Sequence, residues 1–338
     1  MSVLLATVVT LAATAVVWKG SGMLEEASDR LAVYYGLPPV IQGSVVAAIG
    51  SSFPELSVSV LSVVLHGSFD LGVGAVVGSA VFNVLVIPGA SALLAADELD
   101  ANRDVVYKEA LFYMLSIAAL LLVFSLGVIY YPEEGGGRLA ANIPRWLGMV
   151  PIALYGLYVF IQYADTVEYV AESPAESVNV GRQWGSLLLS LVLVVVAVEG
   201  FIYGADVFAT QLGVPEAIWG LTVVAAATSL PDTLVSVRAA RKGRGVTSLG
   251  NVLGSNVFDL LVAVPAGIVL AGGAVIDYGV AVPMMTFLVV ATVVLFTALR
   301  TDLHLTDNEG RLLLGVYGVF LCWMLLETVG VVEFVPGL

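Results

Sequence analysis

The stretches GSSFPE at residues 50–55 and ATSLPD at residues 227–232 each place a proline directly before an acidic residue inside a long apolar run. Proline lacks a backbone N–H, and its ring opposes the carbonyl four residues earlier. Each stretch therefore predicts a kinked helix with a bare carbonyl, that of Gly50 or of Ala227. A charged side chain at membrane depth is costly, and a bound cation or a proton readily offsets that cost.

The surrounding chain has the composition of a membrane protein. Of its 338 residues, 59% are apolar and 12% are charged, and the mean hydropathy is +0.99. These values exclude a water-soluble enzyme, and the net charge of -14 excludes nucleic acid as a main partner. The only cysteine, Cys322, excludes a disulfide framework. Apolar runs predict ten transmembrane helices, at 2–18, 36–65, 71–96, 106–131, 143–163, 184–208, 214–236, 247–272, 278–299 and 311–333.

The basic residues predict an orientation in the cell membrane. Eleven Lys and Arg residues fall on one side of the ten predicted spans, and only Arg138 and Arg145 fall on the other. Basic residues mark the cytoplasmic side of membrane proteins. We therefore expect a multi-pass protein with both termini outside the cytoplasm.

The chain contains an internal repeat. An offset of 177 aligns Ser52, Pro54 and Glu55 with Ser229, Pro231 and Asp232, and an offset of 176 aligns Ser79 and Asn83 with Ser255 and Asp259. Each half holds five predicted spans, and an odd number makes the halves cross the membrane in opposite senses. The expected fold is an all-α polytopic membrane protein of two inverted five-helix repeats, 1–165 and 184–338, joined by an acidic cytoplasmic linker at 166–183.

Inverted repeats place the binding site at the membrane midplane, where the halves meet. Ser79 with Asn83, and Ser255 with Asp259, are spaced i, i+4 and so share a helix face. Glycines at 74, 78, 250 and 254 have the small-xxx-small spacing that allows close helix contact. The repeated side chains form an all-oxygen ligand set, and hard cations such as Ca²⁺ and Na⁺ prefer oxygen.

At these motifs the sequence resembles the calcium/cation antiporter superfamily. Within it, residues 77–83, 239–243 and 254–259 resemble the potassium-dependent sodium/calcium exchangers most closely. The resemblance implies a secondary active antiporter, not an enzyme, that exchanges Na⁺ for Ca²⁺ by alternating access and needs no cofactor. Potassium co-transport stays open, because the Asp at position 259 also occurs in members that ignore K⁺. The oligomeric state is not predicted.

The resemblance also assigns the ligands position by position. Glu55 and Asp232 would be the central Ca²⁺ ligands, and Asn83 and Asp259 would complete the midplane site. Six hydroxyl side chains and two backbone carbonyls would serve Na⁺. They are Ser51, Ser52, Ser79, Thr228, Ser229 and Ser255, with the carbonyls of Ala48 and Ala225.

Three alternative functions predict features that differ from those of an exchanger of Na⁺ for Ca²⁺. A cation/proton exchanger would carry a different Glu- and His-containing element, and a passive cation channel would show no counter-transport. An intramembrane aspartyl protease would use two acids such as Asp232 and Asp259, but the sequence has no Gly-x-Gly-Asp element. The first and sixth spans, the latter with Gly200 and Gly204, are expected to slide past the core. Glu199 and Asp206 in the sixth span could guide ions, stabilise a helix end or form gating contacts.

Overall fold

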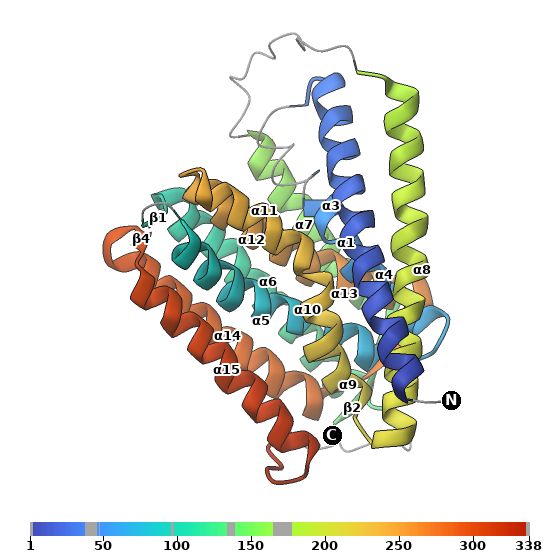
Figure 1. The fold of residues 1–338 in the computed structure, drawn as a ribbon. Helices are drawn as coiled ribbons and strands as arrows, with labels where there is room; N and C mark the ends of the chain where they lie inside the picture. The colour runs from blue at the N-terminus through green and yellow to red at the C-terminus, as the bar shows by residue number, and fades with distance from the viewer. Residues whose placement is uncertain are drawn as a thin grey trace.

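The computed structural model describes residues 3–37, 46, 48–95, 98–133, 139–164 and 178–335. Within these ranges the chain is almost entirely helical (Figure 1). Helices α1 and α8 lie side by side at one edge, and the other long helices form an obliquely packed bundle beside them. The two chain ends lie at the same end of the molecule.

Eight helical stretches of the described chain are long and apolar enough to cross a membrane. They are α1 (Val3–Tyr34), α5 (Phe69–Leu94), η2 (Asp104–Glu109) with α6 (Ala110–Tyr130), α7 (Arg145–Ala164), α8 (Val180–Leu212), α12 (Gly245–Phe258) with η4 (Asp259–Ala263) and α13 (Val264–Ala271), α14 (Tyr278–Asp302), and α15 (Asp307–Thr328). The labels η mark π-helical turns.

Two predicted spans are interrupted. The seventh consists of α9 (Glu216–Trp219), η3 (Gly220–Val224), α10 (Ala225–Thr228) and α11 (Leu230–Arg241), with a bend of 45° before α11. The second contains α3 (Ala48–Ser51) and α4 (Phe53–Val64). Its first part, residues 38–45 and 47, lies outside the described residues, so the number of ten spans stays a prediction.

The ends of α1 and α8 correct two predicted boundaries. The first apolar run was expected to end at residue 18, but α1 continues to Tyr34. The added segment includes the stretch Met23 to Ala27, whose Met, Leu, Glu and Ala residues favour helix, and it buries Leu24 and Ala27. Helix α8 begins at Val180, within the predicted linker, and the Asn179 side chain caps it by accepting from the Arg182 N–H at 3.1 Å. Residues 165–177 lie outside the described residues.

Helix α5 occupies the centre of the bundle. Its most apolar window is 94% buried, against 28% for α1, so α5 is enclosed by protein on all sides. Gly78 permits this packing, because a Cβ there would lie 2.3 Å from the Leu221 carbonyl oxygen. The predicted close approach is thus confirmed for α5. Gly254 meets no described residue within 4 Å, and Ser44, which aligns with Leu221 in the repeat, lies outside the described residues.

Two short antiparallel ribbons connect the halves of the chain. Strand β1 (Leu99–Asp100) pairs with β4 (His304–Leu305), and β2 (Ala140–Pro144) pairs with β3 (Gly273–Asp277). In chain order β1 and β3 precede α6 and α14, whereas β2 and β4 precede α7 and α15. Each ribbon therefore joins one strand from each half, and the two ribbons lie far apart in the bundle (Figure 1).

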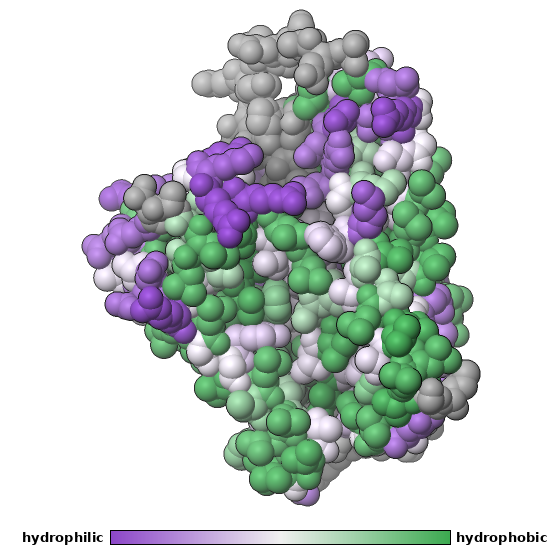
Figure 2. Space-filling model, viewed as in Figure 1, coloured by the Kyte–Doolittle hydropathy of each residue, from purple (hydrophilic) through white to green (hydrophobic). Residues whose placement is uncertain are grey.

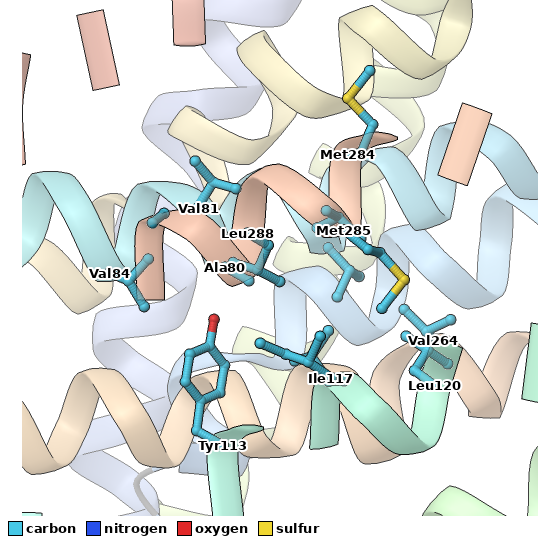
Figure 3. Close-up of a cluster of buried hydrophobic side chains, with 14 of the residues drawn as sticks. Ala80, Val81, Val84, Tyr113, Ile117, Leu120, Val264, Met284, Met285 and Leu288 are labelled. Atoms are coloured by element: carbon cyan, nitrogen blue, oxygen red, sulfur yellow. The ribbon is translucent and has the colours of Figure 1, made fainter. Parts of the chain in front are cut away.

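The surface and the interior are both strongly apolar. Hydrophilic residues gather toward the upper part of the molecule, and a largely hydrophobic body lies below them (Figure 2). Exposed leucines on the outer helices include Leu4, Leu111 and Leu325. Inside, residues of α5, α6, α13 and α14 interdigitate around Met285 (Figure 3). This core holds α5 in place, and α5 carries Ser79 and Asn83.

Candidate cation-binding site

Each proline stretch interrupts its helix at a serine. Ser52 separates α3 from α4, and Ser229 separates α10 from α11, with ψ angles of 8° and -4°. Pro54 and Pro231 then lie in the first turns of α4 and α11, where a missing N–H costs little. The predicted interruption is confirmed, and it puts Glu55 and Asp232 in the first turns, where the helix dipole favours a negative charge.

The acidic side chains point inward. Glu55 is 1% exposed, Asp232 2%, and Asp259 0%, so none of them faces lipid. Helices α4 and α11 both pack against α5, which brings the two kinked segments to the same central helix. The Glu55 carboxylate lies within electrostatic range of both Asp232 and Asp259. The two halves of the chain therefore converge on one buried polar region.

Serine side chains join the halves directly. The Ser79 hydroxyl donates to the Glu55 carboxylate at 3.1 Å and lies 2.8 Å from the Ser229 hydroxyl. Across the site, the hydroxyls of Ser51 and Ser255 are 3.2 Å apart. Ser79 of α5 thus contacts the helix break of the second half, and Ser255 of α12 contacts that of the first half.

An asparagine that sequence reasoning overlooked lies between the halves. The Asn83 amide donates to the Asn256 side-chain oxygen at 3.0 Å, and the Asn256 amide donates to the Ala80 carbonyl at 3.3 Å. Asn256 aligns with Ala80 under the offset of 176, so each contacts its own counterpart. Its position directly after Ser255 in a quoted motif was the available signal, but the matching Ala80 carries no polar side chain.

Several buried oxygen atoms of the site have no hydrogen-bond partner. They are Ser52 Oγ, Glu55 Oε2, Asn83 Oδ1, Asp232 Oδ1, and both Oδ1 and Oδ2 of Asp259. A buried polar atom without a partner costs roughly 1–3 kcal/mol, and more when it is charged. Cations would relieve that cost, because all six atoms are hard oxygen ligands.

The carboxylates do not form a metal cluster by themselves. Among the described residues, no three His, Cys, Asp or Glu side chains lie close enough together to hold one metal ion. A cation bound at one carboxylate must therefore take its other ligands from hydroxyl, amide and carbonyl oxygens or from water. This fits the mixture of side chains that the repeat predicts.

The two predicted backbone ligands are engaged already. The Ala48 carbonyl accepts from the Ser52 N–H at 2.9 Å and from the Ser51 hydroxyl at 3.4 Å. The Ala225 carbonyl accepts from the Ser229 N–H at 3.0 Å and from the Thr228 hydroxyl at 3.3 Å. Each of these two carbonyls therefore already accepts two hydrogen bonds.

One residue of undecided role has a defined contact. Glu199 of α8 lies 3.1 Å from His66 Nε2, just beyond the end of α4, and both side chains are partly exposed. The contact joins the α1 and α8 pair to the core.

Buried helix breaks with oxygen ligands inside and apolar side chains on the outer helices are typical of multi-pass membrane proteins that bind cations. The model of the family "Sodium/calcium exchanger protein" matches residues 5–164 and 182–326. The chain belongs to this family. The family and the matching solved structure are those of exchangers, so they do not support the alternative of an intramembrane protease.

Relatives and a solved structure agree with this membership. The sodium/calcium exchanger MaX1 of Methanosarcina acetivorans is 26% identical over 339 residues, covering 90% of this chain and 93% of MaX1. The mouse sodium/potassium/calcium exchanger 4 is 38% identical over 135 residues, which is 37% of this chain and 21% of that protein. The crystal structure of the sodium-calcium exchanger NCX_Mj matches with a TM-score of 0.62 and 23% identity, over 95% and 99% of the two chains. At that identity the structural match establishes the fold.

Proposed function

We propose that this protein exchanges Na⁺ for Ca²⁺ across the cell membrane and that Na⁺ entry drives Ca²⁺ out. One observation carries the proposal: carboxylate, amide and hydroxyl oxygens from the two interrupted helices, from α5 and from η4 converge in the protein interior and lack partners there. The family membership and the name of MaX1 support the same pair of ions.

The proposed ligands come from the two interrupted helices, from α5, and from α12 with η4. Glu55 and Asp232 bind Ca²⁺, with Asn83 and Asp259 completing the site. The surrounding hydroxyls serve Na⁺, and the inter-half contacts of Ser79 and Ser51 support this role. Three carboxylates cannot hold full complements of Ca²⁺ and Na⁺ at once. Binding of one ion species then displaces the other, which is the requirement for exchange.

We further propose that the halves are inverted repeats with ten spans in total. The cross-paired ribbons support this arrangement, since β1 and β3 hold equivalent places in the two halves, as do β2 and β4. The contact between Asn256 and its counterpart Ala80 also fits a two-fold axis near the site. The basic residues at the end of α11, Arg238 and Arg241, fit a cytoplasmic location for that end and external termini.

Alternating access is assigned to the pair of α1 and α8. Small residues let the two helices pack closely: a Cβ at Gly200 would lie 3.0 Å from Ala13 Cβ, and one at Gly20 would lie 3.1 Å from Val194 Cγ2. A pair that adheres this tightly can move as one body against the core. Its sliding would open the site to one side of the membrane and then to the other.

The decisive experiment uses purified protein in liposomes. Uptake of ⁴⁵Ca²⁺ should require an outward Na⁺ gradient and should stop when choline replaces Na⁺. Ca²⁺ flux that is indifferent to the Na⁺ gradient would indicate a channel, and flux driven by a proton gradient would indicate a cation/proton exchanger. Adding K⁺ to the Ca²⁺ side, or leaving it out, measures whether K⁺ is co-transported.

A further inference from the structure

A groove on the outside of the bundle runs between the η2 and α6 segment and α14. Residues of 106–114 and of 292–301 line it, and its volume is about 590 Å³. Sites that hold small-molecule ligands have volumes of about 300–1,000 Å³. None of the proposed exchange ligands lines this lateral groove. It is therefore separate from the cation site and large enough for a ligand of its own.

The walls of the lateral groove are apolar and face the lipid. On its α6 side Leu111 is 68% exposed, and on its α14 side Val293 is 52% exposed. Met114 and Phe296 also line the groove and are partly buried against the hydrophobic core. In a membrane-spanning helix, such exposed apolar side chains contact hydrocarbon chains.

The threonines in the groove do not change this character. Thr292, Thr297 and Thr301 each donate their hydroxyl proton to the backbone carbonyl four residues earlier in α14, at 2.7, 2.7 and 3.1 Å. A hydroxyl that is bonded to its own helix has no proton left for a ligand. The groove therefore suits an acyl chain rather than a polar molecule.

One end of the groove carries a positive charge. Arg300 lies in the last turn of α14, and its guanidinium carbon is 6.0 Å from the centroid of the Tyr107 ring of η2. Both residues line the groove. No Asp or Glu of the described chain forms an ion pair with Arg300. Its charge is thus held at the groove by an aromatic ring and is not neutralised there.

This charged end lies where lipid headgroups begin. Helix α14 ends and η2 begins next to the ribbon of β1 and β4, which lies at the left of Figure 1, where hydrophilic residues also gather in Figure 2. At about 1.5 Å per residue, the stretches 106–114 and 292–301 extend roughly 12–14 Å along their helices. Half of a bilayer core is about 15 Å thick. The groove therefore matches the depth of one leaflet.

We propose that the lateral groove binds one anionic glycerophospholipid, with its phosphate at Arg300 and an acyl chain between α6 and α14. In the orientation proposed above, this is the cytoplasmic leaflet, whose anionic lipids are attracted to basic residues at the membrane surface. A guanidinium can form two parallel hydrogen bonds with a phosphate. Because α6 belongs to the first half and α14 to the second, the bound lipid would connect the two halves.

The test is native mass spectrometry of the purified full-length protein in detergent. The protein is titrated with dioleoyl phosphatidylglycerol or dioleoyl phosphatidylcholine, which share their acyl chains and differ in net charge. The first phosphatidylglycerol should bind with a Kd about fivefold lower than that of phosphatidylcholine, the contribution expected of one basic residue beside an anionic lipid. Arg300→Gln should remove this preference, and Arg300→Lys should keep most of it.

Two further variants separate the groove from general surface charge. Arg311 of α15 is also an exposed arginine near a helix end, but it pairs with Asp307 at 3.9 Å and does not line the groove. Arg311→Gln should therefore keep the preference for phosphatidylglycerol. Ala110→Phe fills part of the groove without changing any charge. It should raise the Kd of both lipids about tenfold, the loss expected when about two CH₂ groups leave the groove.

Several results would overturn the lipid site. Equal affinity of the unmodified protein for both lipids would do so, as would an equal loss in Arg300→Gln and Arg311→Gln. Unchanged binding by Ala110→Phe would place the lipid elsewhere. Tighter binding of oleate than of phosphatidylglycerol would indicate a fatty-acid site, and a mass of two chains without lipid would indicate that a second copy covers the groove.

Thermal unfolding in detergent shows whether each variant is folded. Should Arg300→Gln not fold, Ala110→Phe and the comparison of the two lipids on the unmodified protein still decide the question. The measurement needs no counter-transport, so the lipid site and the proposed exchange function can each fail without the other.

Discussion

The two halves of the site share a backbone plan but differ in charge. In the first half, the break at Ser52 is followed by Glu55, and α5 continues as a regular helix through Asn83. In the second half, the break at Ser229 is followed by Asp232, and α12 gives way to a π-helical turn at Asp259. One half thus offers one carboxylate and the other offers two. The duplicated scaffold sets where the ligands lie, and the difference between Asn83 and Asp259 sets which ions they can neutralise.

Removing Glu55 or Asp232, the carboxylates at equivalent positions of the two halves, should have the largest effect on exchange. Glu55→Gln or Asp232→Asn should lower Na⁺-driven ⁴⁵Ca²⁺ uptake by about a hundredfold, because contacts to a charged group contribute roughly 1.5–3 kcal/mol each. Glu26→Gln serves as a control, since Glu26 is exposed and pairs with Arg30. Full exchange by Glu55→Gln would remove Glu55 from the site.

The charge difference between the halves can be removed by one substitution. Asp259→Asn gives both halves a neutral amide, and we expect about a tenfold loss of apparent affinity for Ca²⁺ through the lost charge. Fewer Na⁺ ions per Ca²⁺ should then be counted from the reversal potential of liposome uptake. The opposite change, Asn83→Asp, adds a fourth carboxylate. Unchanged coupling in both variants would mean that the charge difference has no role in exchange.

Substitutions of Ser79 on α5 and Ser255 on α12 test the difference between the two halves with a smaller expected effect on exchange. The Ser79 hydroxyl donates to the Glu55 carboxylate at 3.1 Å and lies 2.8 Å from the Ser229 hydroxyl, whereas the Ser255 hydroxyl lies 3.2 Å from the Ser51 hydroxyl. Ser79→Ala should therefore raise the Na⁺ concentration for half-maximal exchange more than Ser255→Ala, by about threefold to tenfold for a lost charge-assisted bond. Equal effects would show that the halves use these hydroxyls alike.

The smallest effect concerns packing. A Cβ at position 78 would meet the Leu221 carbonyl oxygen at 2.3 Å, and backbone cannot move aside easily. Gly78→Ala should destabilise the protein by about 1–3 kcal/mol, the usual range for overpacking, as measured by thermal unfolding in detergent. Gly250→Ala, whose Cβ meets no described residue within 4 Å, is the comparison variant. A similar loss there would point to contacts with the part of the chain not described.

The repeated residues could be predicted because repetition exposes them. Glu55 and Asp232 stood out as acids beside prolines in apolar runs, and Ser79 and Ser255 followed from the alignment; the structure places all four inside. Asn256 could not be found in this way, because its counterpart Ala80 carries no polar side chain and the repeat therefore does not mark the position. The extent of α1 was also missed, since hydropathy marks where lipid ends, while packing against α8 decides where the helix ends.

The two ribbons limit how this molecule can change shape. Strands β1 and β4 tie the halves together in one part of the bundle, and β2 and β3 tie them in another. Because the two halves are connected by β-strand pairs at two separate places, a hinge motion that separates one half from the other would have to break at least one of these pairs. The substitution Val275→Pro in β3 would disrupt the pairing of β3 with β2. It should therefore let the two halves move more freely relative to each other, while every proposed ion ligand stays in place.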